Sequence, residues 1–256
     1  MHSALLTAAL IATTALPAIA QDDDDCRHEA QRSATVDANG ARLLSIEAGS
    51  GFLKIVGKPG INQVIIRGRA CASHADLLNE IRLTANREGS DVVITANKRE
   101  RNDWSGYHGN EYARLDVTIE VPARMAAEIA DGSGSIDISN LGAVRIEDGS
   151  GDIVGNGLNG DVRVKDGSGG IRLIDVAGRL DIDDGSGSIT LRNINGAIDI
   201  DDSSGEINIR GAHNNVRISD SSGSIDVVDV DGDFVVDDDS SGSIDYDNVK
   251  GRVDIP

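Results

Sequence analysis

The sequence predicts an all-β protein, more specifically a β-solenoid in which each coil of about 18 residues carries two short strands. The motif Asp-Gly-Ser-Gly or Asp-Ser-Ser-Gly recurs through the second half of the 256-residue chain, with gaps of 17, 18, 18, 18, 18 and 19 residues between successive aspartates. Between these motifs apolar residues alternate with polar ones, and Ile and Val dominate, as in strands with one buried face. Glycine recurs about every nine residues, which is too frequent for helices.

Each repeat divides into two halves of nine residues, as in GSITLRNIN followed by GAIDIDDSS in residues 187–204. Two apolar residues at i and i+2 give each half one buried face, and stacking the coils joins these residues into continuous aliphatic rows. With only 2% aromatic residues, the predicted core is thin. A third inward column is expected at Leu158, Val176, Ile194, Ala212, Val230 and Val249.

Residues 1–20, MHSALLTAALIATTALPAIA, have the pattern of a secretory signal peptide. The segment is apolar from Ala4 onward and has alanine at positions −3 and −1 of a cleavage point after Ala20. A membrane anchor is the competing interpretation, but the run is short for a spanning helix and the acidic QDDDD follows at once. We therefore expect export to the periplasm, the cell surface or the medium, with no membrane span after cleavage.

The mature chain is expected to have an irregular β-rich part, residues 21–125, and a regular solenoid, residues 126–256. In the irregular part, residues 48–68 suggest one loose coil. Residues 78–98 alternate in two runs across a Gly-Ser turn and suggest a hairpin.

Two cysteines, Cys26 and Cys71, favour an intramolecular disulfide, because export leads to an oxidising compartment. The alternative is a tetrahedral metal site that adds His28 and His74 to the two thiols, although the spacing fits no standard zinc finger.

The segment 98–114 contains three of the six aromatic residues of the chain, with basic residues around them. Exposed aromatic and basic side chains suit a contact with a partner or glycan, whereas packing over the end of the solenoid as a cap is an equal alternative. The candidate residues of this loop are Trp104, Tyr107, His108 and Tyr112.

Four features carry a resemblance to a known family: GSGFLKIVG, the strand pair around EGSDVVITA, the run LDVTIEVPARMAAEIADGSG, and the tandem GSGSI and GDVRV units. Together they resemble an exported bacterial family of β-strand-repeat proteins of unknown function, known as putative adhesins. The resemblance covers most of the mature chain. It implies a β-solenoid of the cell envelope and supplies no catalytic residues.

Acidic residues form a predicted column at equivalent corners of the coils, where stacking places like charges about 4.8 Å apart. We expect solvent, salt and backbone N–H groups to relieve the repulsion between them. The alternative is a ladder of divalent cations, since carboxylates suit Ca²⁺. Apart from this Ca²⁺ alternative, the sequence predicts no cofactor. The column consists of Asp148, Asp166, Asp184, Asp202, Asp220 and Asp239.

The net charge of −19 excludes nucleic-acid binding, which requires a basic surface. A carbohydrate-active β-helix enzyme would need two carboxylates across a groove together with sugar-stacking aromatics, but the coils all offer similar acids and almost no Trp or Tyr.

We therefore predict a non-catalytic structural or binding protein of the cell envelope, adhesin-like, whose partner is an envelope protein or glycan. The alternatives are a Ca²⁺-responsive binding module and a carbohydrate-active enzyme. The last strand, GRVDI, is expected to leave an edge that can pair end to end with another copy.

Overall fold

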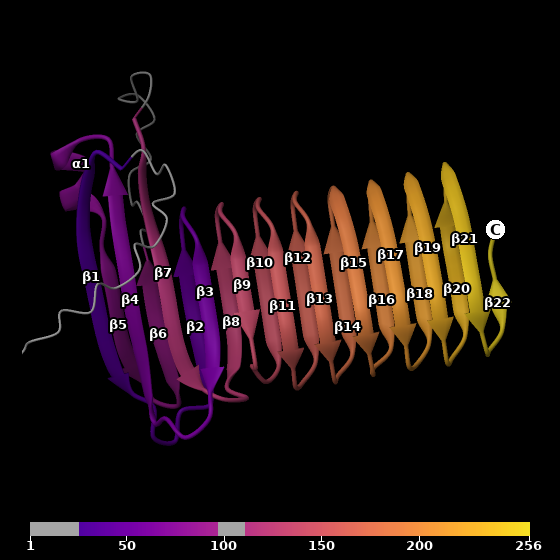
Figure 1. Ribbon diagram of the computed structural model, residues 1–256, viewed down its shortest axis with the longest axis horizontal. Helices are drawn as coiled ribbons and strands as arrows, with labels where there is room; N and C mark the ends of the chain where they lie inside the picture. The colour runs from indigo at the N-terminus through magenta and orange to yellow at the C-terminus, as the bar shows by residue number, and fades with distance from the viewer. Residues whose placement is uncertain (1–25, 97–110) are drawn as a thin grey trace, which may run out of the picture.

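The computed structural model describes residues 26–96 and 111–256, which form two facing sheets of eleven strands each (Figure 1). The predicted all-β solenoid is confirmed. Sheet A contains, in spatial order, β1 (His28–Asp37), β4 (Gln63–Ala72), β7 (Ala113–Pro122), β3 (Leu53–Lys58), β9 (Ile136–Ser139), β11 (Ile153–Leu158), β13 (Ile171–Val176), β15 (Gly187–Ile194), β17 (Gly205–Ala212), β19 (Gly223–Val230) and β21 (Gly242–Val249).

Sheet B faces sheet A across the core. It contains, in spatial order, β22 (Val253–Asp254), β20 (Phe234–Asp239), β18 (Val216–Asp220), β16 (Ile198–Asp202), β14 (Leu180–Asp184), β12 (Val162–Asp166), β10 (Val144–Asp148), β8 (Ala126–Asp131), β2 (Leu43–Ala48), β6 (Asp91–Ala96) and β5 (Leu83–Glu88).

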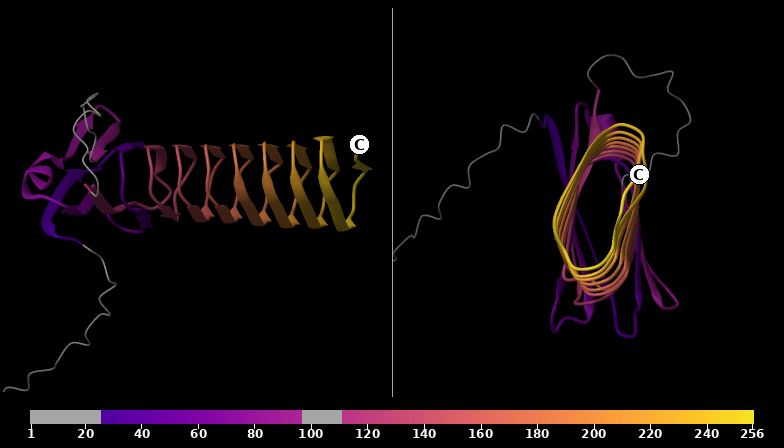
Figure 2. Two further views of the ribbon diagram at one scale, coloured as in Figure 1. Left: turned by 90° about the horizontal axis from the view of Figure 1, so that it is seen from above. Right: turned by 90° about the vertical axis from the view of Figure 1, so that its right-hand side faces the viewer.

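From β8 onward the chain alternates between the sheets, so each coil places one strand in sheet B and the next in sheet A. Neighbouring coils are parallel and in register, for example Ile189 opposite Ile207 and Ile198 opposite Val216. Viewed along the rod, the coils superpose as nested ovals (Figure 2). This register stacks identical positions of the repeat, which explains the strict period of the sequence.

The core consists of the predicted aliphatic rows. In β16, Ile198 and Ile200 point inward and are 2% and 1% exposed, while Asp199 between them faces outward. The third column is also confirmed: its first five members are fully buried, and Val249 in the last coil is half-buried. The core is almost entirely aliphatic, and Phe234 is the only fully buried aromatic residue among those that the structure describes.

One corner of each coil is built on a residue with positive φ that immediately precedes a member of the third inward column, which the structure extends by the fully buried Leu141. Asn and Asp tolerate this left-handed conformation better than other residues with a Cβ, and Gly adopts it freely. The corner residues are Asn140, Gly157, Asp175, Asn193, Gly211, Asp229 and Asn248, with φ from 52° to 74°. The preference for Asn, Asp and Gly at this corner is therefore explained by the positive φ that the backbone adopts there.

The other corner stacks glycines of successive coils so closely that a side chain has no room. Gly205 has a φ of +151°, and a Cβ built on it would overlap the carbonyl oxygen of Gly187 in the preceding coil. Both the backbone conformation and the contact therefore require glycine.

Replacement of Gly205 by alanine is expected to lower the free energy of unfolding by about 3 kcal/mol or more, because strain and displacement of a neighbouring coil combine. Gly40 is the matched control, since its φ is +68° but no atom lies within 4 Å of the built Cβ. There the substitution should cost only about 1 kcal/mol. Urea denaturation of both variants measures the difference, and equal losses would contradict the steric account.

The N-terminal part departs from the coil pattern. Strand β4 lies between β1 and β7 and is antiparallel to both, so the loose coil expected over residues 48–68 is wrong: β3 and β4 belong to one sheet. The hairpin expected in residues 78–98 is confirmed as β5 and β6. It is preceded by an unpredicted six-residue helix, α1 (Ala75–Glu80), which is too short to show a helical period.

Cys26 and Cys71 form a disulfide, as predicted, with a Cα–Cα distance of 5.5 Å. Since the two sulfurs are bonded to each other, the alternative metal site with His28 and His74 is excluded. The bridge joins the segment before β1 to the end of β4, and Cys71 is fully buried.

Substitution of Cys26 by serine opens a loop of 45 residues and is expected to destabilise the fold by about 3–4 kcal/mol. Thermal melts of the wild type with and without a reductant provide a second measurement of the same effect. If neither treatment lowers the melting temperature, the bridge contributes nothing to stability.

Candidate functional site

The predicted aspartate column forms, but its carboxyl groups lie inside the solenoid. Each aspartate ends a strand of sheet B and stacks in register on the next, as in Asp184 opposite Asp202 and Asp202 opposite Asp220. In β16 the same alternation that buries Ile198 and Ile200 also turns Asp202 inward. The exposed fractions are 8% for Asp131 and Asp148, 4% for Asp166, 2% for Asp184 and Asp220, and 1% for Asp202.

Backbone N–H groups satisfy only one oxygen of each buried carboxyl group. Oδ1 of Asp202 accepts a hydrogen bond from the N–H of Ser204 at 3.1 Å, and Oδ1 of Asp220 accepts one from Ser222 at 3.0 Å. The expectation that solvent relieves the repulsion is therefore wrong for these residues, whereas the expected backbone donors are present. The oxygens without a hydrogen-bond partner are Oδ2 of Asp131, Asp148, Asp166, Asp184, Asp202 and Asp220, and Oδ1 of the half-buried Asp239.

Burial raises the pKa of Asp148, Asp184 and Asp202 to about 6, because desolvation penalises the charged form. Carboxylates of neighbouring coils raise these pKa values further, and the backbone donors lower them in part. Desolvation likewise raises the pKa of Asp131, Asp166 and Asp220. The column therefore holds protons at a mildly acidic pH.

Calcium binding along this column finds little support in the geometry. No group of three or more His, Cys, Asp or Glu residues suited to a metal occurs in residues 26–96 and 111–256. Ca²⁺ requires six to eight oxygen ligands, whereas the column offers one unpartnered buried oxygen per coil.

We expect thermal melts in Ca²⁺ and in EDTA to give the same melting temperature. A clear rise with Ca²⁺ would instead support the cation ladder.

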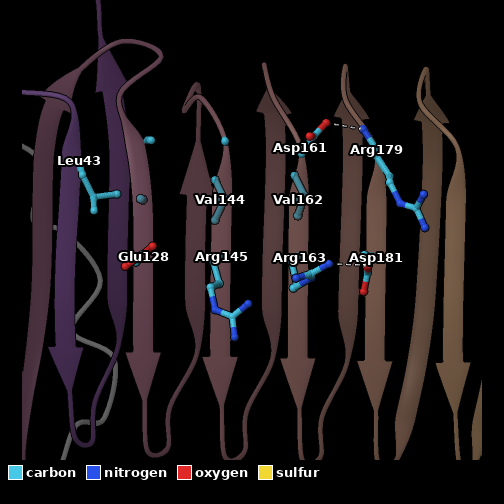
Figure 3. A pocket seen from close by; sticks show the side chains of 12 residues that line it. Leu43, Glu128, Val144, Arg145, Asp161, Val162, Arg163, Arg179 and Asp181 are labelled. Carbon is cyan, nitrogen blue, oxygen red and sulfur yellow. Dashed lines mark hydrogen bonds and ion pairs between the residues drawn. The ribbon is translucent and has the colours of Figure 1, made fainter.

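A hollow of about 360 Å³ lies on the outer face of sheet B, across β2, β8, β10, β12 and β14 (Figure 3). Its lining combines the small side chains of Ala126 and Ala143 with several charged side chains. Arg163 pairs with Asp181 at 3.0 Å, and Asp161 accepts a hydrogen bond from the backbone N–H of Arg179 at 2.9 Å. A hollow with a partly apolar lining and a few converging polar groups is typical of a binding site.

The candidate partner loop is described only at its end. Tyr112 is half-buried, and its hydroxyl accepts a hydrogen bond from the backbone N–H of Arg27 at 3.1 Å. Its backbone exchanges hydrogen bonds with Ser73, so this tyrosine ties the segment after residue 110 to the N-terminal part. Trp104, Tyr107 and His108 lie outside the described residues, and their role stays a prediction.

Two facing sheets that are parallel along the stack of near-identical coils, with charged outer faces and an aliphatic core, define a β-solenoid repeat protein. No helix of the described residues is long and apolar enough to cross a membrane. The chain belongs to the Toastrack DUF4097 family, which matches residues 76–255, and this confirms the resemblance found in the sequence.

No curated protein matches the chain. Among solved structures it is similar to a Parabacteroides distasonis protein described as a "putative lipid binding protein", with 16% identity, a TM-score of 0.52, and coverage of 90% of this chain and 97% of that chain. A Bacteroides fragilis "putative adhesin" has 13% identity, a TM-score of 0.39 and coverage of 90% and 98%. A Clostridium sporogenes "putative cell adhesion protein" has 15% identity, a TM-score of 0.31 and coverage of 89% and 99%. The first likeness supports the fold and does not extend to a ligand.

Proposed function

We propose that the protein is a non-catalytic binding protein of the bacterial cell envelope or surface. The hollow on the outer face of sheet B is the observation that carries the proposal. Its volume of about 360 Å³ lies within the range of ligand sites, and its lining combines Arg145, Arg163 and Arg179 with small and apolar side chains. Export, expected from residues 1–20, would place this face in contact with envelope components.

Three carboxylates line this hollow, and two of them, Asp161 and Asp181, already have structural partners. Only Glu128 is left without one among the described residues, which supports binding over catalysis by a pair of carboxyl groups. Asp181 pairs with Arg163 of the preceding coil, and Asp161 fixes the backbone of Arg179 in the next coil. A glycosidase needs one carboxyl group free to protonate the leaving oxygen and a second free to attack or to activate water. Both aspartates instead hold neighbouring coils together.

The test is sedimentation of the purified protein with separated envelope fractions: peptidoglycan, membranes and extracellular polysaccharide. We expect saturable binding to at least one fraction without release of new reducing ends. Ala143→Arg should fill the hollow and weaken this binding about tenfold, because a bulky side chain displaces the ligand from the hollow. Ala177→Arg is the matched control, since Ala177 is also exposed but does not line the hollow.

Two results would overturn the proposal. One is steady release of reducing ends from a polysaccharide fraction, abolished by a single Asp→Asn substitution, which would establish an enzyme. The other is the absence of saturable binding to every fraction.

A further inference from the structure

Three consecutive coils place exposed arginines together on the outer face of sheet A, which is opposite the hollow just described. Strands β13, β15 and β17 contribute Arg172, Arg192 and Arg210, one from each coil, in the orange part of the rod (Figure 1). These arginines, with Thr190 and Asn208, line a hollow of about 240 Å³. We call these five residues the arginine cluster.

Two of the three arginines of the cluster, Arg172 and Arg192, carry positive charge that no ion pair of the described residues neutralises. Arg192 lies directly opposite Arg210 in register, an arrangement of like charges that is destabilising between neighbouring strands. Arg210 reaches Asp226 at 3.2 Å. In contrast, none of the ion pairs within residues 26–96 and 111–256 involves Arg172 or Arg192.

Elsewhere on the rod, exposed arginines have carboxylate partners. On sheet B this holds for Arg145, Arg163, Arg179 and Arg217, which pair with Glu147, Asp181, Asp199 and Asp237. The chain has 43 acidic residues against 24 basic ones, so carboxylates are not scarce. Two unpaired guanidinium groups beside a third in such a chain indicate that the missing anions come from a ligand.

We propose that the arginine cluster binds an anionic polysaccharide that runs along the rod axis, with one acidic group at each of three coils. This inference rests on the proposed binding function and gives it a ligand class. Coils repeat at about 4.8 Å along the axis. That spacing is close to the advance of one sugar residue in an extended pyranose chain, so two successive carboxylates or sulfates would meet Arg192 and Arg210, which lie in register. Arg172 lies one coil earlier and two residues along the strand, so it would meet an acidic group to one side of that line.

The chemistry of the lining residues suits this ligand. The planar guanidinium fork binds carboxylate and sulfate oxygens through two parallel hydrogen bonds. Thr190 and Asn208 supply a hydroxyl and an amide for sugar hydroxyl groups. Asp226 lies within the screening length of about 8 Å at physiological salt, but its charge is paired with that of Arg210. Acidic residues beyond that length repel the polymer only weakly.

A lipid bilayer is the less favoured source of anions. Surfaces that dock on membranes add apolar side chains that enter the boundary of the bilayer. The arginine cluster has polar side chains above the fully buried Leu191.

The test measures binding of the whole mature chain to polygalacturonate, with dextran as the neutral polymer. The first variant carries Arg172→Gln, Arg192→Gln and Arg210→Gln. The matched control carries Lys165→Gln, Arg217→Gln and Arg252→Gln, which removes the same charge from exposed ion pairs elsewhere. We expect the first variant to bind at least about tenfold more weakly and its logarithmic salt dependence to decrease by about three, while the control binds like the wild type.

The outcomes separate this inference from the proposed function. If both triple variants bind polygalacturonate equally more weakly than the wild type, or if neither does, the arginine cluster is not the binding site. Binding to envelope fractions without binding to any acidic polysaccharide would overturn the ligand class and leave the proposed function intact. Cluster-dependent binding to anionic phospholipid vesicles alone would assign the site to a bilayer. Absence of binding to every polymer, vesicle and fraction would overturn both.

Discussion

Between pH 5 and pH 8 the free energy of unfolding is expected to fall by several kcal/mol. The pKa of Asp148, Asp184 and Asp202 is about 6 in the folded protein, against 3.8 for an unperturbed aspartate. Between these two values the folded chain binds more protons than the unfolded chain, so stability decreases as the pH rises. The stabilisation is complete below about pH 4 and is lost as the pH passes 6, at about 1–3 kcal/mol per carboxyl group.

Urea denaturation at pH 5, 6, 7 and 8 and constant ionic strength measures this profile. Most proteins gain stability as carboxylates ionise, so the expected direction is unusual and therefore diagnostic. Surface pairs such as Asp231 with Lys250, which lowers the pKa of Asp231, act in the opposite direction but are exposed. A profile that is flat or rises from pH 5 to pH 8 would show that the buried carboxyl groups find a partner other than a proton.

Replacement of Asp184, Asp202 and Asp220 by asparagine is expected to stabilise the protein at pH 8 and to flatten the pH profile. An asparagine oxygen can still accept the backbone hydrogen bond now made by Oδ1, and no charge is buried. The amide group replaces the unpartnered Oδ2 and can donate to the next coil, as in stacked asparagine ladders. The gain at pH 8 should be about 1–3 kcal/mol at each of Asp184 and Asp202, and at Asp220 it should have the same sign.

The matched control replaces Asp183, Asp201 and Asp238, which are exposed and lie next to members of the column. It changes the net charge by the same amount, yet each substitution should alter stability by no more than about 0.5 kcal/mol. If both triple variants gain equally at pH 8, then general charge repulsion, and not burial of the column, limits stability. If the first variant loses stability at pH 8, the unpartnered oxygens are better satisfied than the structure indicates.

The sequence predicts those features of the fold that follow from the repeat. Alternation of Ile198 and Ile200 with polar neighbours predicts the strands, and the 18-residue period predicts their stacking. The same alternation continues to Asp202, but a carboxyl group is normally assigned to solvent. The burial of Asp202 can be predicted only if the inward–outward alternation of side chains is extended to residue 202 regardless of its polarity.

Other features depend on pairing over long distances and have no local signal. The composition of strand β4 resembles that of a strand in a regular solenoid coil. Its antiparallel orientation follows only from its pairing with β1 and β7. The hollow on sheet B arises because small and charged residues of different coils become neighbours. The arginine cluster likewise combines residues from three repeats, and Arg172 lies in a different outward column from Arg192 and Arg210.

The antiparallel, disulfide-linked N-terminal part also has a kinetic consequence. A single coil cannot bury its apolar face alone, so an already folded edge stabilises the first coil that adds to it. Strands β3 and β2 supply that edge, because β9 pairs with β3 and β8 pairs with β2. Each later coil adds a contact with its immediate predecessor, so folding can advance one repeat at a time from the N-terminal part toward residue 256 and exposes only one growing end to aggregation.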